Sequence, residues 1–375
     1  MTRKIPWWEP QTGPVEYDLV RGVLKSNFLN DGDVTSQFEA RISELVAARH
    51  AVAVTSGTAA IYLALAAAGV ARGDEVIIPD ITFIATANAV TMTGATPVLA
   101  DVDPKTLNLC PEAFQAAITP RTKAVVPVHV SGRAADLENI LKIAADHGIE
   151  VIEDAAEAFM SRHSGRCLGT FGKAGCFSFS PNKTITTGQG GMIVTNDEKL
   201  HGRLRELKDQ GRPVRGTGGD DVHATIGYNF KLTNLQAAVG LGQLSYLHTR
   251  MERMQAIYLD YVRELAGVPG LRLPGFRLDE GERPQWTDAV IEQRELVDRH
   301  LLANNVICRR FWFPLHTQTP YRAPDHLFPN ACAVGPRALW LPSAFTLTNE
   351  EVAATCSLVR ECLLGTEALS CQGRL

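Results

Sequence analysis

The lysine at position 183 is the residue whose setting most clearly predicts chemistry. Lys183 lies between an apolar, alternating segment at residues 177–180 and a glycine-rich turn at residues 188–191. A primary amine forms a Schiff base with a carbonyl only when it is deprotonated, and burial favours that neutral form. A lone lysine beside Thr and Gly is more often a solvated loop residue. The Schiff-base interpretation therefore depends on partners elsewhere in the chain.

Carboxylates at the end of another apolar segment are candidate partners. Val151 and Ile152 lead into Glu153 and Asp154, and Glu157 follows. In open α/β sheets ligands bind at the carboxyl ends of strands, which favours a ligand role for Asp154, although an aspartate there can equally cap a helix. A buried lysine and such an acid together suit pyridoxal phosphate (PLP). The ring nitrogen of PLP must stay protonated for the ring to accept electrons.

Two further features match the remaining demands of PLP. Ser56-Gly57-Thr58 turns a strand-like segment directly into a helix-like one, and free amides at a helix N-terminus attract a phosphate. The same turn also suits a plain helix cap. Phe83, at the start of the second helical segment, could stack on a planar ring or belong to the core. With Lys183, these features supply an imine lysine, a phosphate turn and a stacking aromatic.

Other glycine-rich segments do not predict nucleotide loops. Residues 188–191 lead into a strand rather than a helix, and residues 169–175 lack the Walker spacing and its Ser or Thr after lysine. Both nucleotide-loop interpretations are rejected.

The length, charge and cysteine content limit the classes of protein to which the chain can belong. At 375 residues and 45% hydrophobic, the chain has room for two domains. A net charge of -4 with scattered Lys and Arg predicts no nucleic-acid binding. The start has no apolar leader, and the apolar run at 59–71 is too short for a membrane span, which predicts a cytoplasmic protein with no membrane partner. Eight cysteines without a Cys-x-x-Cys pair, and histidines without ligand spacing, predict reduced thiols and no metal site.

The segments that must position these residues alternate between strand-like and helix-like patterns. Such alternation predicts an α/β fold with a mostly parallel sheet covered by helices. Proline-glycine pairs at 269–270 and 274–275 then interrupt the chain, and we place domains at residues 1–248 and 249–375, the second a smaller α+β unit. Disorder is predicted for residues 370–375. The predicted strands are 51–55, 75–79, 97–102, 123–130, 150–154, 176–180, 191–195, 288–292 and 306–311; the predicted helices are 59–71, 83–93, 111–118, 135–147, 235–247, 251–265, 294–304 and 349–364.

Several long motifs, taken in order, resemble the DegT/DnrJ/EryC1/StrS sugar aminotransferases, most closely the GDP-perosamine synthase-like branch. The resemblance runs from Ile5 to about Leu364 and implies the PLP-dependent transferase fold type I, with an N-terminal segment, residues 1–35, that reaches the site. The motifs that carry it are Ser56–Ala60, Glu153–Glu157, Phe177–Met192 and Gly227–Ala238.

The resemblance also implies a role for individual residues. Lys183 matches the lysine that bonds to PLP and moves the proton, and Asp154 matches the partner of the ring nitrogen. Asn229 matches a residue that reaches the phosphate from a neighbouring subunit, which implies a homodimer with active sites at the interface. The other implied cofactor contacts are Phe83 against the ring, Glu157 near the ring hydroxyl, and Gly57, Thr58 and Ser178 on the phosphate; the implied substrate contacts are Phe28, His129, Arg309, His316 and Tyr321.

Three positions depart from the family pattern. Gln189 stands where glutamate is usual, Lys231 where arginine is usual, and Thr184 replaces a histidine common in the perosamine branch. These changes affect local electrostatics and substrate contacts rather than the cofactor. A related dehydratase branch carries histidine at the position of Lys183, so lysine there favours transamination.

The activity implied is transfer of the amino group of L-glutamate to a nucleotide-linked 4-keto-6-deoxy sugar for a surface polysaccharide such as O-antigen. Two alternatives stay open. One is a relative that acts at carbon 3 or on a non-nucleotide cyclic ketone in secondary metabolism. The other is a non-catalytic, PLP-binding regulatory protein, which the presence of both Lys183 and Asp154 disfavours.

Overall fold

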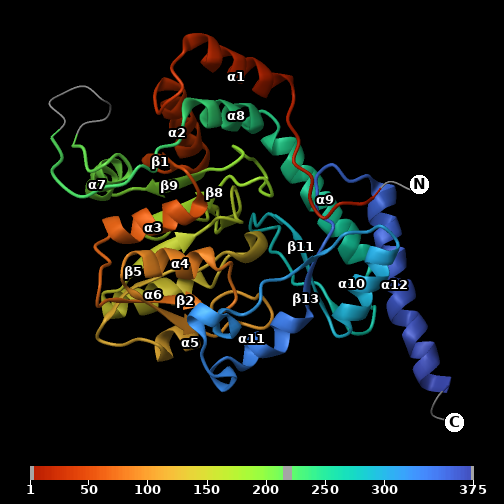
Figure 1. Ribbon diagram of the computed structural model, residues 1–375. Helices are drawn as coiled ribbons and strands as arrows, with labels where there is room; N and C mark the ends of the chain where they lie inside the picture. The colour runs from red at the N-terminus through yellow and green to blue at the C-terminus, as the bar shows by residue number, and fades with distance from the viewer. Residues whose placement is uncertain (1–3, 214–221, 373–375) are drawn as a thin grey trace.

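A seven-stranded sheet lies at the centre of the larger domain (Figure 1). The computed structural model describes residues 4–213 and 222–372, with side chains described as far as residue 365. Strand β9 is antiparallel to β1 and β8, and the other neighbours are parallel, so the prediction of a mostly parallel sheet is confirmed. In sheet order the strands are β1 (His50–Val54), β9 (Gly191–Thr195), β8 (Ala174–Ser178), β5 (Glu150–Asp154), β4 (Thr122–Val125), β2 (Glu75–Pro79) and β3 (Thr96–Ala100).

Helices cover both faces of this sheet, because successive side chains of a strand point to opposite faces. Val52 and Val54 pack in one core cluster with helix α3, whereas Ala51 and Ala53 pack in another with helix α2. Burial on both faces explains why the strands are continuous apolar runs. The first face is covered by α3 (Gly57–Ala67), α4 (Ala85–Met92) and α7 (Glu198–Lys208), and the second by α2 (Asp33–Val46), α5 (Pro111–Ala116), α6 (Leu137–His147) and α8 (Asn234–Leu244).

The smaller domain is built on a four-stranded antiparallel sheet. Its core contains Tyr261 of α9, Leu301 of α10 and Val359 of α12. Among the helices of the described residues, none combines the length and the apolar character needed to cross a membrane. In sheet order its strands are β10 (Leu271–Arg272), β11 (Thr287–Ile291), β13 (Ala338–Leu341) and β12 (Arg309–Arg310), and its helices are α9 (Leu247–Glu264), α10 (Arg294–Ala303) and α12 (Asn349–Gln372).

Some predicted element bounds are wrong. The strand predicted at 306–311 is only two residues long in the structure, as β12. The strand predicted at 123–130 ends at Val125, where the chain leaves the sheet. Helix α12 continues to Gln372, so the predicted disorder fails for residues 370–372, while residues 373–375 lie outside the described residues. Helix α9 spans the region of the predicted domain boundary at 248, with Leu247 in the large-domain core and Tyr261 in the small-domain core, and the boundary itself stays a prediction.

The N-terminal segment joins the two domains. Ile5 pairs with Val306 of the small domain, and helix α1 (Pro14–Ser26) then packs along α8, as the red and green helices at the top of Figure 1 show. Between them, the indole Nε1 of Trp8 donates a hydrogen bond to the carbonyl of Pro181 at 2.9 Å. The start of the chain therefore contacts the turn that carries Lys183.

A buried ion pair fixes the two domains against each other. Arg133 lies in the connection between β4 and β5 and pairs with Asp288 of β11. Both side chains are almost completely inaccessible to solvent. The Ser131 hydroxyl donates to the second carboxylate oxygen of Asp288 at 2.7 Å. Charges buried in this way must be paired and hydrogen-bonded, so the relative placement of the domains is closely specified.

Candidate active site

A cavity of about 450 Å³ lies where the carboxyl ends of the large-domain strands meet the small domain. Ligands of open α/β sheets bind at this edge of the sheet. The cavity brings together eight of the residues predicted from the sequence. These are Gly57, Thr58, Phe83, Asp154, Glu157, Ser178, Lys183 and Arg309.

Lys183 points its amine at an acid and an aromatic ring. Its Nζ lies 3.4 Å from Glu157 Oε1 and 4.5 Å from the centre of the Trp286 ring. Burial lowers the pKa of the Lys183 amine, while the negative charges of Glu157 and Asp154 raise it. The amine is thus close to a group that can exchange a proton with it and is in surroundings that favour the neutral nucleophile.

Asp154 ends β5 with its carboxylate facing the cavity. Its Oδ2 accepts a hydrogen bond from the Thr86 hydroxyl at 2.8 Å, and its Oδ1 accepts one from the Ala156 amide at 3.1 Å. Burial raises the pKa of Asp154, although the bond from Thr86 acts in the opposite direction. A buried carboxylate held by neutral donors still favours a cationic partner, which the protonated ring nitrogen of a pyridine cofactor would supply.

The turn from β1 into α3 forms the opposite corner of the cavity. Ser56 caps α3, with its hydroxyl accepting from the Ala59 amide at 3.1 Å. The first amides of a helix have no partner within the helix and point toward an anion. A Cβ atom on Gly57 would lie 2.9 Å from Cβ of Ser178, so a side chain there would collide with the opposite wall. Glycine at this point lets the backbone amides reach the cavity.

These groups fit PLP as a set. An amine, a buried carboxylate and a helix N-terminus line one cavity, and Phe83, half exposed at its edge, presents a ring beside them. An aldehyde, a pyridine nitrogen and a phosphate are the three parts of PLP that need such partners.

Glu157 is the acid whose ionisation changes near neutral pH. Its Oε2 accepts a hydrogen bond from the Ser131 amide at 3.0 Å, and burial raises the pKa of Glu157 from 4.5 to about 7, against the opposing charge of Lys183. Folding therefore favours the protonated acid. Its contribution to stability is fully present below about pH 4.5 and is lost as the pH rises through about 7.

Glu157→Gln should remove this pH dependence. We expect the unfolding free energy of the cofactor-free variant to change less between pH 4.5 and about 7 than that of the parent, because the amide does not titrate. Urea unfolding at a series of pH values measures the effect. An unchanged slope in the variant would show that another group titrates in this window.

Five predicted residues are not among those that line the cavity. His129 is buried behind β5, with Nε2 at 3.0 Å from Glu153 Oε2 and Nδ1 accepting from the Ala135 amide. The Tyr321 hydroxyl donates to Asn88 Oδ1 at 2.7 Å. The remaining three are Phe28, exposed after α1; Asn229, paired through its backbone with Asp209; and His316, buried against Asp80. Their roles in substrate or cofactor binding stay predictions.

Among the residues that line the cavity but were not predicted from the sequence are Thr86, Trp286 and Trp312. Thr86 lies one helical turn after Phe83, and that spacing could have indicated a shared face. Trp286 and Trp312 come from the small domain, and their sequence surroundings carry no signal of the cavity. Only the packing of the domains brings them to Lys183.

Comparison with known proteins agrees with this geometry. The model of the DegT/DnrJ/EryC1/StrS aminotransferase family matches residues 10–360. The chain is 36% identical to a GDP-perosamine synthase of Escherichia coli O157:H7, covering 95% of this chain and 98% of the relative. It is 37% identical to a spore coat polysaccharide biosynthesis protein of Bacillus subtilis, covering 97% and 98%.

Solved structures agree as well. The structure of DesI in the presence of its TDP-sugar product superposes with a TM-score of 0.90 at 32% identity, covering 100% of this chain and 97% of that one. The chain belongs to the DegT/DnrJ/EryC1/StrS aminotransferase family and is a PLP-dependent transaminase.

Proposed function

We propose that the protein transfers the amino group of L-glutamate to the keto carbon of a nucleotide-linked 4-keto-6-deoxy sugar in the cytoplasm, as a GDP-perosamine synthase does. The observation that carries the proposal is the meeting of Lys183, Glu157 and Asp154 in one cavity. Sequence similarity to a GDP-perosamine synthase and the likeness to DesI with its TDP-sugar product support the nucleotide sugar as substrate. We propose that the amino sugar enters a surface polysaccharide. The similarity to a spore coat polysaccharide biosynthesis protein of Bacillus subtilis supports this destination.

PLP, when bound, supplies an aldehyde that takes up the amino group and a ring that accepts electrons. The negative charge of Asp154 would keep the ring nitrogen protonated, and the hydrogen bonds from Thr86 and the Ala156 amide position its carboxylate for this. The N-terminus of α3 at Gly57 and Thr58, together with Ser178, would hold the phosphate.

Lys183 then acts at the reacting carbon. Its neutral Nζ would be the nucleophile toward the aldehyde of the cofactor, and as a free amine the same atom would remove a proton from the reacting carbon and return it. Glu157 exchanges a proton with Nζ over 3.4 Å, and its pKa of about 7 suits that exchange near neutral pH.

Arg309 is a cationic residue that lines the cavity. Its guanidinium lies 4.7 Å from the centre of the Trp7 ring and faces the cavity beside Trp312. Burial lowers the pKa of Arg309 and the charge of Glu157 raises it, but arginine stays charged at any physiological pH. We propose that Arg309 binds the carboxylate of glutamate and, in the second half of the reaction, a phosphate of the sugar nucleotide.

A homodimer is the proposed assembly. Its support from this chain is an exposed apolar face on α1 and the turn after it, where Tyr17, Leu24 and Phe28 are each more than half exposed. Asn229, which lines no part of the cavity in its own chain, would contact the partner's phosphate site in such an assembly.

A panel of keto substrates tests the function. The PLP-loaded protein is treated with L-glutamate and then offered GDP- and TDP-linked 4-keto-6-deoxy sugars, a 3-keto nucleotide sugar and a non-nucleotide cyclic ketone. We expect 2-oxoglutarate to form and mass spectrometry to detect a 4-amino nucleotide sugar. Sedimentation of the same samples should give the mass of a dimer.

Other outcomes would contradict the proposal in distinct ways. Amination of the cyclic ketone or the 3-keto sugar alone would replace the proposed substrate while retaining the transaminase. A loaded, folded protein that released no 2-oxoglutarate would favour the non-catalytic alternative, and a monomer would contradict the assembly.

A further inference from the structure

A second group of ligating side chains lies beside β2, outside the residues that line the cavity. Nε2 of His316 is 3.5 Å from Sγ of Cys332 and 3.5 Å from Oδ1 of Asp325. All three ligand atoms lie within 4.8 Å of one another. The side chains come from the short helices η2 (Leu315–Thr317) and η4 (Asp325–Leu327) and from α11 (Pro329–Val334).

The His316 ring is held so that Nε2 faces this group. Nδ1 lies 2.6 Å from Asp80 Oδ2, and the His316 amide donates to Asp80 Oδ1 at 2.8 Å. Phe328 stacks on the ring at 4.7 Å between centres. The other ring N–H of a histidine that ligates a metal usually donates a hydrogen bond to a carboxylate. This hydrogen bond fixes the tautomer and raises the basicity of the ligating nitrogen. His316 has that arrangement.

The separations suit a tetrahedral ion. Ligand bonds of about 2.0–2.3 Å to zinc at tetrahedral angles place imidazole nitrogen about 3.6 Å from thiolate sulfur and about 3.4 Å from carboxylate oxygen. The two distances of 3.5 Å from His316 are close to both values. An ion could therefore enter without moving the buried ring.

The surrounding charge favours a cation. The carboxylates of Asp325, Asp80 and Asp101 all place negative charge around the Cys332 sulfur. A divalent ion placed among three carboxylates would offset their repulsion and stabilise the thiolate.

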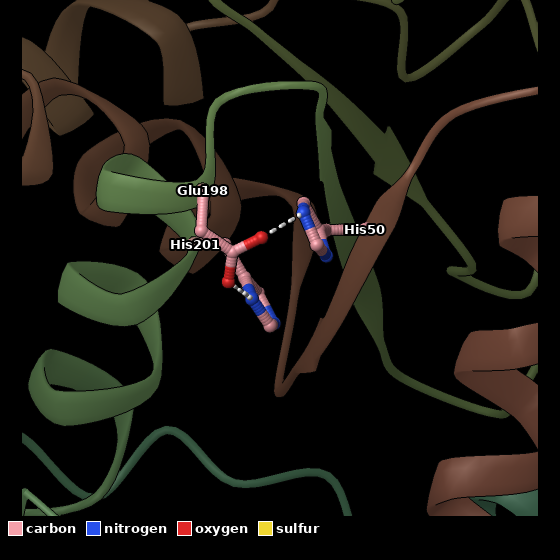
Figure 2. A group of neighbouring side chains, drawn as sticks. All are labelled: His50, Glu198 and His201. Atoms are coloured by element: carbon pink, nitrogen blue, oxygen red, sulfur yellow. Dashed lines mark ion pairs between the residues drawn. The ribbon is translucent and has the colours of Figure 1, made fainter.

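The cluster of His50, Glu198 and His201 offers a contrast (Figure 2). Its imidazole rings are stacked 4.2 Å apart and only 6° from parallel, so one ion cannot lie in the planes of both rings. Arg205 also donates to Nε2 of His201 at 3.2 Å, which leaves the proton on Nδ1, the nitrogen that faces Glu198. The rings would have to turn, and one tautomer change, before this cluster bound a metal.

We propose that His316, Asp325 and Cys332 bind a divalent ion of zinc's chemistry, with water as the fourth ligand. Asp80 follows β2 directly, so the ion would attach the segment 315–332 to the edge of the large-domain sheet. The ligands are separated by 9 and 7 residues and lie on three separate short helices, which explains why spacing alone predicted no metal site.

Cobalt(II) is the probe, because its thiolate charge-transfer and visible ligand-field absorption report a tetrahedral site that contains sulfur. The tag-free, PLP-loaded protein is stripped with a chelator and titrated with Co²⁺, and difference spectra remove the cofactor's absorption. We expect saturable binding of one ion, displacement by Zn²⁺, a higher melting temperature with Zn²⁺, and protection of Cys332 from alkylation in peptide mass spectra.

Variants separate this site from the others. Cys332→Ser and Asp325→Asn should each weaken cobalt affinity by more than about 100-fold, since even partners of the ligands contribute about 10–100-fold. Asp325 is exposed, so its variant tests the site even if Cys332→Ser folds poorly. His50→Gln with His201→Gln is the matched control and should keep the full signal. A folded parent without sulfur-to-cobalt absorption, or a Cys332→Ser variant that retains it, would overturn the proposal.

Discussion

Lys183→Ala is expected to reduce kcat for glutamate-dependent amination by at least about 10²–10⁴-fold, the contribution of a positioned proton-transfer group alone. The variant also loses the nucleophile, so we expect the decrease in kcat to be at the upper end of this range. Rapid mixing with L-glutamate measures the first half of the reaction. Borohydride treatment followed by mass spectrometry should attach a pyridoxyl group to the Lys183 peptide in the parent only.

Lys173→Ala is the matched control. Lys173 is also partly buried and bound to a glutamate, with its Nζ 2.5 Å from Glu150 Oε1, but it does not line the cavity. It should retain parental kcat. If Lys183→Ala turned over as fast as this control, the assignment of the nucleophile would fail.

Asp154→Asn should lower kcat by about 10²–10³-fold, the usual effect of removing one preorganised electrostatic partner from an active site. The amide has nearly the same shape and can keep its contact with the Thr86 hydroxyl, so binding of the cofactor should persist. What is lost is the negative charge that keeps the ring nitrogen protonated. Steady-state kinetics, together with a pH titration of the cofactor's absorption, measures both effects.

Glu153, the neighbouring residue on β5, provides the control for Asp154. Its variant tests whether the loss of any buried carboxylate on this strand has the same effect on kcat. Its oxygens accept from the amides of Gly169, Phe171 and Gly172 and face His129, on the side of the strand away from Lys183. Glu153→Gln should lower the free energy of unfolding but leave the cofactor's titration unchanged. Equal kinetic losses in the two variants would refute a specific role for Asp154.

The sequence could group the residues predicted to bind the cofactor, because each of them lies in a recognisable local pattern. Asp154 ends an apolar strand and Ser56-Gly57-Thr58 joins a strand to a helix, so their position at the carboxyl edge follows from the α/β pattern itself. Lys183 is brought to them by the turn between β8 and β9. The placement of these groups in one cavity followed from recognising the strands correctly.

The rest depends on contacts between distant segments. Nothing near Trp286 indicates that it will lie over Lys183. The substrate role of His129 stays a prediction, and the sequence does not show that Glu153 and the Ala135 amide contact its two ring nitrogens. Helices α1 and α2 were not predicted. Their apolar faces are covered by α8 and by the sheet, and these contacts between distant segments cannot be recognised in the local sequence. The direction of β9 likewise depends on pairing that no local pattern encodes.

That pairing governs the order in which the protein can be completed during synthesis. Within the described residues, β1 has β9 as its only strand neighbour, and His50 pairs with Thr195, which is translated 145 residues later (195 − 50). The β1 edge and the α3 turn that follows it must therefore wait for β9, because β1 cannot form its strand pairing before β9 has been translated. Arg309 and Trp312 emerge later still. A ribosome-bound chain thus cannot form the complete cavity until most of the small domain has been translated.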